Sequence, residues 1–280
     1  MILKSYSKIN LTLSVNDKLK NNLHNIQSYF CLINLCDEIK IKKIFKKANK
    51  KDEIKFFGRF SKNIDNLNNT VSSTLRLLRK KKLISNYYSI KVKKKIPIFS
   101  GLGGGTGNAV SLANFLIKSK NKKGLSDLLN NYIGSDSRLF FYKQGFLKSL
   151  KSVKSFKKYD LYFLLIYPRI NCSTKFIYSK VKNFSPRQRI NLIKFSNKDN
   201  FLNFIAKEKN DLQGIVEKKY PKIKKLIKTI KSENGCYISR MTGSGSVCFG
   251  VFKSKKSAKV ALNRIKLKFP KYWMCVAKTI

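Results

Sequence analysis

The 280-residue chain is poor in acidic residues, with 14 Asp and Glu against 61 Lys and Arg, and it has one histidine and one tryptophan. It also lacks any run of the roughly 20 apolar residues that span a bilayer, so we expect no membrane-spanning segment. The first strand-like run begins within a few residues of the amino terminus, which leaves no room for a signal peptide. The sequence therefore predicts a cytoplasmic protein.

The six cysteines form neither C-x-x-C pairs nor a zinc-binding spacing. Several lie in apolar, strand-like segments, where cysteine acts as a small hydrophobic residue. We therefore expect free thiols, and the sequence assigns no metal ligand. Hydrophobic residues make up 42% of the chain, which is enough for one large or two moderate domains.

The formal net charge of +47 is typical of nucleic-acid-binding proteins. Here, however, lysine is spread along the entire chain instead of gathering in one segment. Lysine also outnumbers arginine, whose planar fork is what reads base edges. The lysines therefore read as a compositional bias of the whole chain, which leaves nonspecific adhesion to nucleic acid open as a side property, and a nucleic-acid-binding function rests on charge alone.

The segment from Ile96 to Val110 is the most informative motif, because it reads as a strand, a glycine-rich turn and an amphipathic helix. Glycines let successive backbone N–H groups converge on an anion, and a helix N-terminus adds positive charge. The spacing matches neither the P-loop nor the G-x-G-x-x-G dinucleotide motif. The turn thus predicts a phosphate-binding site, with an ordinary flexible turn as the alternative.

Apolar periodicity predicts a mixture of strands and helices, which is typical of an α+β chain. We expect strands at about 4–15, 28–44, 52–60, 87–95, 161–167, 236–240, 247–252 and 273–278. We expect helices from Asp65, as N-cap, to Lys80, and over Asn108–Lys118, Asn210–Ile230 and Ser257–Leu267. The Lys- and Ser-rich segment 148–154 reads as a link.

Two further segments accompany the glycine-rich turn. Residues 5–15 alternate apolar and polar, which puts Lys8 and Asn10 on one face of a strand. Residues 239–249 read as a strand, a tight glycine turn and a second strand. In this order and spacing, the three segments resemble the signature motifs of the GHMP small-molecule kinase superfamily.

The resemblance narrows to the 4-diphosphocytidyl-2-C-methyl-D-erythritol kinase family. It rests on Lys8-Ile9-Asn10-Leu11, His24 with Gln27, the turn with Asn108-Ala109, Gly134-Ser135-Asp136 and Asn210-Asp211-Leu212. It implies a two-domain fold, with a ribosomal-protein-S5-like N-terminal domain at 1–152 and a ferredoxin-like C-terminal domain at 153–280. It also implies ATP-dependent phosphorylation of the 2-hydroxyl of a cytidyl diphosphate sugar alcohol, a small-molecule substrate.

The resemblance assigns the phosphoryl-transfer roles. Asp136 would take the proton of the acceptor hydroxyl, and Lys8 would stabilise Asp136 and the moving phosphoryl group. From the residues alone, Asp136 also reads as a helix N-cap and Lys8 as a surface lysine. ATP, arriving with Mg²⁺, would bind the turn formed by Gly101, Leu102, Gly103, Gly104, Gly105, Thr106 and Gly107.

Four residues are predicted to bind the substrate. By the resemblance, His24 would hydrogen-bond the cytosine ring, Tyr178 would stack on it, and Asn10 would hold the methylerythritol hydroxyls. Thr174 would close the same pocket. The sequence leaves the choice between monomer and homodimer open.

Three positions depart from the family pattern. Leu23 replaces a tyrosine that stacks on cytosine, Gly107 replaces a serine of the turn, and Ser137-Arg138 replaces Val-Pro after Asp136. Arg138 would add a cation near the phosphates, which either helps or blocks them. These departures leave open a noncatalytic nucleotide-binding descendant. The other alternative is a homoserine or mevalonate type of GHMP kinase, against which the residues around Lys8 and His24 argue.

Overall fold

The computed structural model describes residues 2–20, 23–45, 51–117, 121–156, 158–188 and 195–280. Its strands are β1 (Ile2–Asn10), β2 (Ser14–Lys18), β3 (His24–Ile44), β4 (Glu53–Phe57), β5 (Tyr87–Lys93), β6 (Gln144–Ser149), β7 (Ser152–Lys154), β8 (Tyr162–Tyr167), β9 (Cys236–Met241), β10 (Cys248–Phe252) and β11 (Trp273–Lys278). Its helices are α1 (Thr70–Lys80), α2 (Gly104–Ile117), α3 (Lys122–Tyr132), the 3₁₀ helix η1 (Ser137–Phe141), α4 (Thr174–Ser179), α5 (Lys198–Lys207), α6 (Gln213–Lys219), α7 (Pro221–Lys231) and α8 (Lys255–Lys268).

The chain folds into two compact units whose segments interleave along the sequence. Unit 1 comprises Met1–Lys8, Leu35–Ile98 and Gly103–Tyr142, and unit 2 comprises Ile9–Asn34, Phe99–Leu102 and Lys143–Ile280. The strands β1 and β3 therefore contribute residues to both units. The boundary at 152/153 stays a prediction of where two family domains meet.

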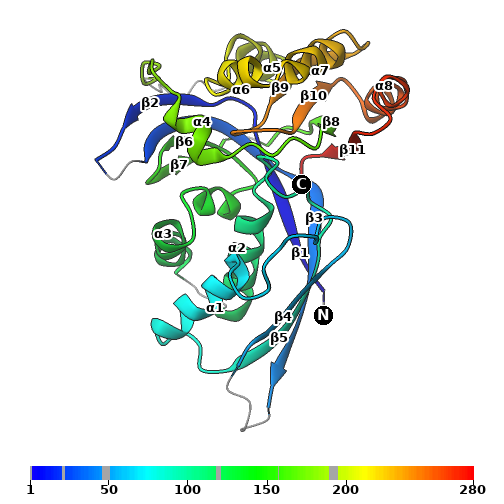
Figure 1. Ribbon diagram of the computed structural model, residues 1–280. Coiled ribbons are helices and arrows are strands. Elements are labelled where there is room, and N and C mark those ends of the chain that lie inside the picture. Colours follow the sequence, from blue (N-terminus) through cyan, green and yellow to red (C-terminus); the bar gives the residue numbers. More distant parts are fainter. Residues whose placement is uncertain (1, 21–22, 46–50, 118–120, 157, 189–194) are drawn as a thin grey trace. The chain divides into compact units, whose positions relative to one another are not determined.

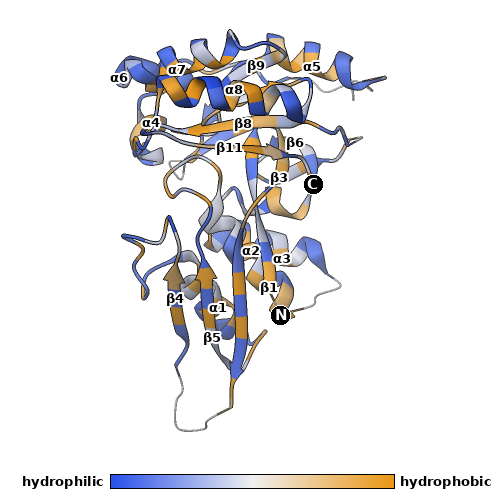
Figure 2. Cartoon of the chain, turned by 90° about the vertical axis from the view of Figure 1, so that its right-hand side faces the viewer, coloured by the Kyte–Doolittle hydropathy of each residue, from blue (hydrophilic) through white to orange (hydrophobic). Residues whose placement is uncertain are grey.

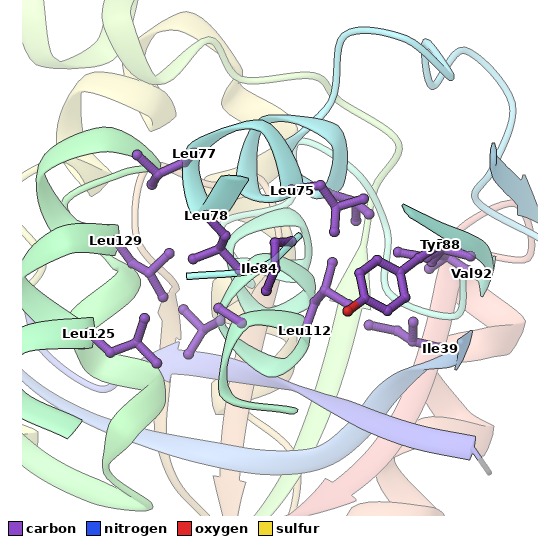
Figure 3. Packing of buried hydrophobic residues seen from close by; sticks show 14 residues of the cluster. Ile39, Leu75, Leu77, Leu78, Ile84, Tyr88, Val92, Leu112, Leu125 and Leu129 are labelled. Carbon is purple, nitrogen blue, oxygen red and sulfur yellow. The ribbon is translucent and has the colours of Figure 1, made fainter. Parts of the chain in front are cut away.

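Unit 1 is built on the strand order β4-β5-β3. Strand β5 pairs in parallel with β4, through the crossover helix α1, and antiparallel with β3. Figure 1 shows α1 and α2 side by side against these strands. Their core is mostly aliphatic, and in Figure 3 Leu75 and Leu78 of α1, Leu112 of α2 and Leu129 of α3 point toward one another.

Unit 2 contains a four-stranded antiparallel sheet, in the order β11-β8-β10-β9. With α7 between β8 and β9 and α8 between β10 and β11, this is the order of a ferredoxin-like split βαβ domain. Strand β8 is coloured mostly hydrophobic in Figure 2, because both faces of this central strand are covered. Helix α7 buries Ile223, Leu226, Ile227 and Ile230 and leaves its lysines outside.

Several predicted elements differ from the structure. The expected strand at 4–15 is interrupted after Asn10, and the expected helix at 210–230 divides into α6 and α7 because Pro221 begins a new helix. The segment 148–154 is not a link, since β6 and β7 pair there as a hairpin. The predicted end of the helix at Lys118 lies outside the described residues.

The start of α1 also differs from the prediction. The N-cap is Asn69, not Asp65, because the Asn69 side chain accepts from the Ser72 N–H and the Ser72 hydroxyl accepts from the Asn69 N–H. Asp65 instead accepts from the Leu67 N–H and organises the preceding turn. Composition alone did not separate the two, since both residue types are good caps.

We expect Asn69→Ala to lower the free energy of unfolding by about 1 kcal/mol, because it leaves the Ser72 N–H without its side-chain acceptor. Urea denaturation followed by circular dichroism measures this loss. Asp65→Ala is the matched control and should have a smaller effect. An equal or larger loss for Asp65→Ala would contradict the assignment of the cap.

Candidate active site

A buried lysine and a partly exposed aspartate form an ion pair within unit 1. The Lys8 ammonium lies 3.1 Å from the Asp136 carboxylate, and their side chains are 3% and 34% exposed. Asp136 directly precedes η1 but makes no side-chain capping hydrogen bond to it. The contact with Lys8 therefore sets the carboxylate apart from an ordinary helix cap, and the two residues from distant motifs meet.

The glycine-rich turn lies against the same residues. Gly103 has a φ of 69°, which favours glycine. A Cβ at this position would lie 2.8 Å from the Phe140 ring and 3.2 Å from carbons of the Lys8 side chain. The backbone can approach Lys8 this closely only without a side chain. The turn and the ion pair are thus one packed arrangement in unit 1.

Helix α2 begins directly at the turn, at Gly104. The first N–H groups of a helix have no carbonyl partner within it, and the helix dipole places positive charge there. The first turn of α2 contains no acidic residue. Gly105 is exposed, Thr106 is half-buried, and Leu102 is buried as an apolar anchor. This arrangement suits a phosphate group.

Lys94 adds a charge near the turn that no sequence motif predicted. Its ammonium would lie 3.4 Å from a Cβ on Gly104, and it pairs with Asp37 in the buried interior of unit 1. Asp37 also accepts from the N–H groups of Lys95, at 2.7 Å, and Ile96, at 2.9 Å. This network holds the chain that leads into the turn. Lys94 was hidden because it stands in a run of three lysines.

Two of the departures from the family pattern have structural explanations. A Cβ on Gly107 would lie 2.9 Å from both the Phe140 ring and the Tyr6 carbonyl oxygen, so this position faces packed atoms. The guanidinium of Arg138 binds Asp127 of α3 at 2.5 Å, and Arg138 is 7% exposed. Arg138 therefore anchors η1 to α3.

The other predicted site residues lie in unit 2. Asn10 is buried, where its side-chain amide donates to the Ser28 hydroxyl at 2.8 Å and its N–H donates to the Thr242 hydroxyl at 3.0 Å. The Thr174 and Ser244 hydroxyls lie 2.9 Å apart. Both Asn10 and Thr174 therefore contact the loop between β9 and β10.

That loop, residues 242–247, is a second glycine-rich turn, at which no site residue was predicted from the sequence. Asn210 holds it by donating to the carbonyls of Met241 and Gly243 at 2.9 and 2.8 Å. Within unit 2, a Cβ on Gly101 would lie 2.2 Å from the Thr242 carbonyl oxygen. The spacing of Gly243 and Gly245 was the available signal, but only the fold shows that the loop meets Gly101.

Arg240 of β9 binds the backbone of neighbouring segments in unit 2. Its guanidinium donates to the carbonyls of Leu11, Ile205, Ala206 and Glu208. Burial lowers the pKa of Arg240 to about 10, because removal from water disfavours the charged form. This arginine therefore ties the end of β1 to α5 and is structural.

His24 begins β3 and lies beside two aromatic rings. Its ring centroid is 5.1 Å from that of Tyr178 on α4 and 6.4 Å from that of Phe184. Burial lowers the pKa of His24, and repulsion by Lys18, its partner in the β2–β3 pairing, lowers it further, against a smaller opposite effect of Asp17. Both effects favour the neutral imidazole, which has one donor and one acceptor nitrogen.

Comparison with known proteins shows the family to which this chain belongs. Residues 69–134 match the GHMP kinases N terminal domain family, and residues 194–271 match the GHMP kinases C terminal family. A 4-diphosphocytidyl-2-C-methyl-D-erythritol kinase of Pelagibacter ubique is 40% identical over 99% of this chain and 98% of its own. One of Wolbachia pipientis wMel is 33% identical over the same shares. The chain belongs to the 4-diphosphocytidyl-2-C-methyl-D-erythritol kinase family.

Solved structures agree on the fold of this family member. A crystal structure of 4-(cytidine 5'-diphospho)-2C-methyl-D-erythritol kinase superposes with a TM-score of 0.77 at 19% identity, covering 99% of both chains. A homoserine kinase from Cytophaga hutchinsonii gives 0.69 at 18% identity, covering all of this chain and 94% of that one. The predicted α+β, two-domain GHMP kinase fold is confirmed. None of the described helices is long and apolar enough to cross a membrane.

We expect the single histidine of this family member to titrate with a midpoint below the usual 6.5. The folded state binds fewer protons than the unfolded state between the lowered pKa and 6.5, so protonation in this window weakens folding. Proton NMR of the imidazole C–H signal measures the midpoint, and the urea-unfolded chain is the control. Lys18→Gln should raise the folded midpoint; a folded midpoint at or above 6.5 would contradict the burial of His24.

Proposed function

We propose that this protein transfers the γ-phosphoryl group of ATP to the 2-hydroxyl of 4-diphosphocytidyl-2-C-methyl-D-erythritol. The observation that carries the proposal is the Lys8–Asp136 ion pair packed against the glycine-rich turn. Full-length relatives bear the name of this kinase, which favours it over the homoserine and mevalonate kinases that share the fold. The ion pair favours a catalyst over a noncatalytic binding protein.

The proposed reaction is a single in-line displacement. Asp136 takes the proton of the 2-hydroxyl while the hydroxyl oxygen of the substrate bonds to the γ-phosphorus. At the same time, the bond from that phosphorus to the β,γ-bridging oxygen breaks. ADP leaves, and no phosphoenzyme forms. Lys8 neutralises negative charge that develops on the transferred group. Both residues belong to unit 1, with the turn residues from Gly103 to Gly107.

The remaining predicted residues take binding roles in this proposal. The N–H groups at the start of α2 hold the ATP phosphates, with Gly101 and Leu102 completing the turn. His24 and Tyr178 bind the cytosine base, and Asn10 and Thr174 bind the methylerythritol side of the substrate. Those six residues belong to unit 2. Expectations of a cytoplasmic location, of nonspecific adhesion to nucleic acid, and of a monomer or homodimer stay predictions.

Mg²⁺ is proposed to enter with ATP. Within the described ranges, no group of three or more His, Cys, Asp or Glu side chains could hold a metal ion by itself. Mg²⁺ does not require such a group, because it keeps several waters and binds through substrate phosphates and one or two carboxylates. Asp136 is the carboxylate next to the turn, and the ion would supply neutralising charge to the phosphates.

A coupled assay of ADP release tests the substrate. With ATP and Mg²⁺ present, we expect turnover with 4-diphosphocytidyl-2-C-methyl-D-erythritol and none above background with homoserine or mevalonate. The polar groups of a cytidyl pocket would remain unpaired with those smaller acceptors. Turnover of homoserine or mevalonate at a comparable rate would overturn the assignment of the substrate, and no turnover of any acceptor would overturn the assignment as a kinase.

Asp136→Asn is expected to lower kcat by about 10²- to 10⁴-fold with little change in ATP affinity, because the amide cannot take the hydroxyl proton. The coupled assay and calorimetric titration with an ATP analogue measure the two effects. Asp160→Asn, at a carboxylate that is 81% exposed, is the matched control and should keep full activity. A kcat for Asp136→Asn within threefold of that of the parent would contradict the catalytic role of Asp136.

A further inference from the structure

An exposed aromatic ring stands beside His24 in unit 2, and no sequence motif predicted it. Phe184 is 45% exposed, and its ring is tilted by 38° to the imidazole at 6.4 Å. Tyr178 is tilted by 34° to the same imidazole at 5.1 Å. The imidazole therefore has an aromatic neighbour from α4 and another from the segment that follows α4. Leu23, directly before His24, is aliphatic and 45% exposed.

Phe184 begins a segment that is fastened to the β2–β3 hairpin; we call residues 184–188 the strap. At its start, the Ser185 N–H donates to the Val15 carbonyl at 2.8 Å. The Asn16 side-chain amide donates to the carbonyls of Ser185 and Pro186 at 3.0 and 3.3 Å. These bonds fix the backbone immediately after Phe184.

The far end of the strap is fastened to the same hairpin. The Gln188 N–H donates to the Gln27 side-chain oxygen at 2.7 Å, and the Gln27 amide donates back to the Gln188 carbonyl at 3.3 Å. The Arg187 guanidinium lies 2.5 Å from the Asp17 carboxylate. Asp17 lies in β2, and Gln27 lies in β3, the strand that begins at His24. The strap is therefore fixed at both ends, and the exposed ring of Phe184 is held beside the imidazole of His24.

The three rings together have the chemistry of a nucleobase pocket. A flat heteroaromatic base stacks on aromatic rings without regard to its identity. A neutral imidazole offers one donor and one acceptor to the polar edge of the base, which is what distinguishes a base from a plain apolar ring. An aliphatic side chain such as Leu23 cannot provide a π-face. Phe184, in the segment that follows α4, can provide such a π-face.

We infer that Phe184 is a substrate-binding residue that stacks on the cytosine base of the substrate, held for this role by the strap. The inference rests on the proposed function, since it assigns a residue to the base-binding part of the same site. Phe184 and Tyr178 thus form the aromatic walls, and His24 reads the edge of the base. Asn16 is a positioning residue that acts through the strap.

Calorimetric titration of the full chain with cytidine 5′-diphosphate tests the inference. Phe184→Ala should raise the Kd about 5- to 150-fold, the equivalent of the 1–3 kcal/mol of one base–aromatic stack. Phe184→Tyr should restore the Kd to within threefold. The Kd for an ATP analogue should stay unchanged in both variants.

Phe176→Ala is the matched control. Phe176 is also an exposed ring, on α4, but its face is covered by the Lys219 ammonium at 3.6 Å. Its removal should leave cytidine diphosphate binding unchanged. An equal loss of affinity for Phe176→Ala and Phe184→Ala would overturn the inference, because the effect would then not depend on the ring beside His24.

Asn16→Ala tests the strap. It should weaken cytidine diphosphate binding in the parent but have no further effect in a Phe184→Ala background, because both changes then remove the same stack. Additive losses would overturn the positioning role. If the parent binds cytidine diphosphate and Phe184→Ala binds it equally well, the inference fails and the proposed function stands. If the parent does not bind cytidine diphosphate, both fail.

Discussion

Close backbone approach at the glycine-rich turn is the constraint on which the rest of the candidate site depends. In unit 1, Gly103 and Gly107 leave room for the Phe140 ring, and Gly103 also lies against Lys8. In unit 2, Gly101 leaves room for the carbonyl of Thr242. A single Cβ at any of these positions would overlap atoms that cannot move away cheaply. The turn is therefore defined by what packs against it as much as by its own flexibility.

Positive charge is abundant in this protein and negative charge is scarce, and three of the carboxylates form ion pairs with buried cations. Asp136 pairs with Lys8, Asp37 with Lys94 and Asp127 with Arg138. Each of these carboxylates meets a cation whose side chain is less than a tenth exposed. Removing one partner from such a pair leaves a buried charge without compensation, which costs more than the pair contributes. These three acidic residues thus mark buried polar positions among the many lysines of the chain.

Through their resemblance to a known family, the motifs were sufficient to predict the family, the fold class and the meeting of Lys8 with Asp136, since each motif is local and is recognised without the fold. They were insufficient for Lys94, which is one of three adjacent lysines until Asp37 selects it. The same holds for the cap of α1, because Asp65 and Asn69 are equally good caps by type, and only the hydrogen bonds to Ser72 decide between them.

The order of residues along the chain determined the alternation of β1, the glycine content of both turns and the aromatic character of position 178, all of which follow from properties of neighbouring residues. Tertiary structure alone decided that Phe184 lies beside His24, 160 positions away in the sequence, because bonds from Val15, Asn16 and Gln27 hold the strap there. It also decided that Gly107 faces the interior. Contacts between distant segments depend on how they pack, and no local pattern records them.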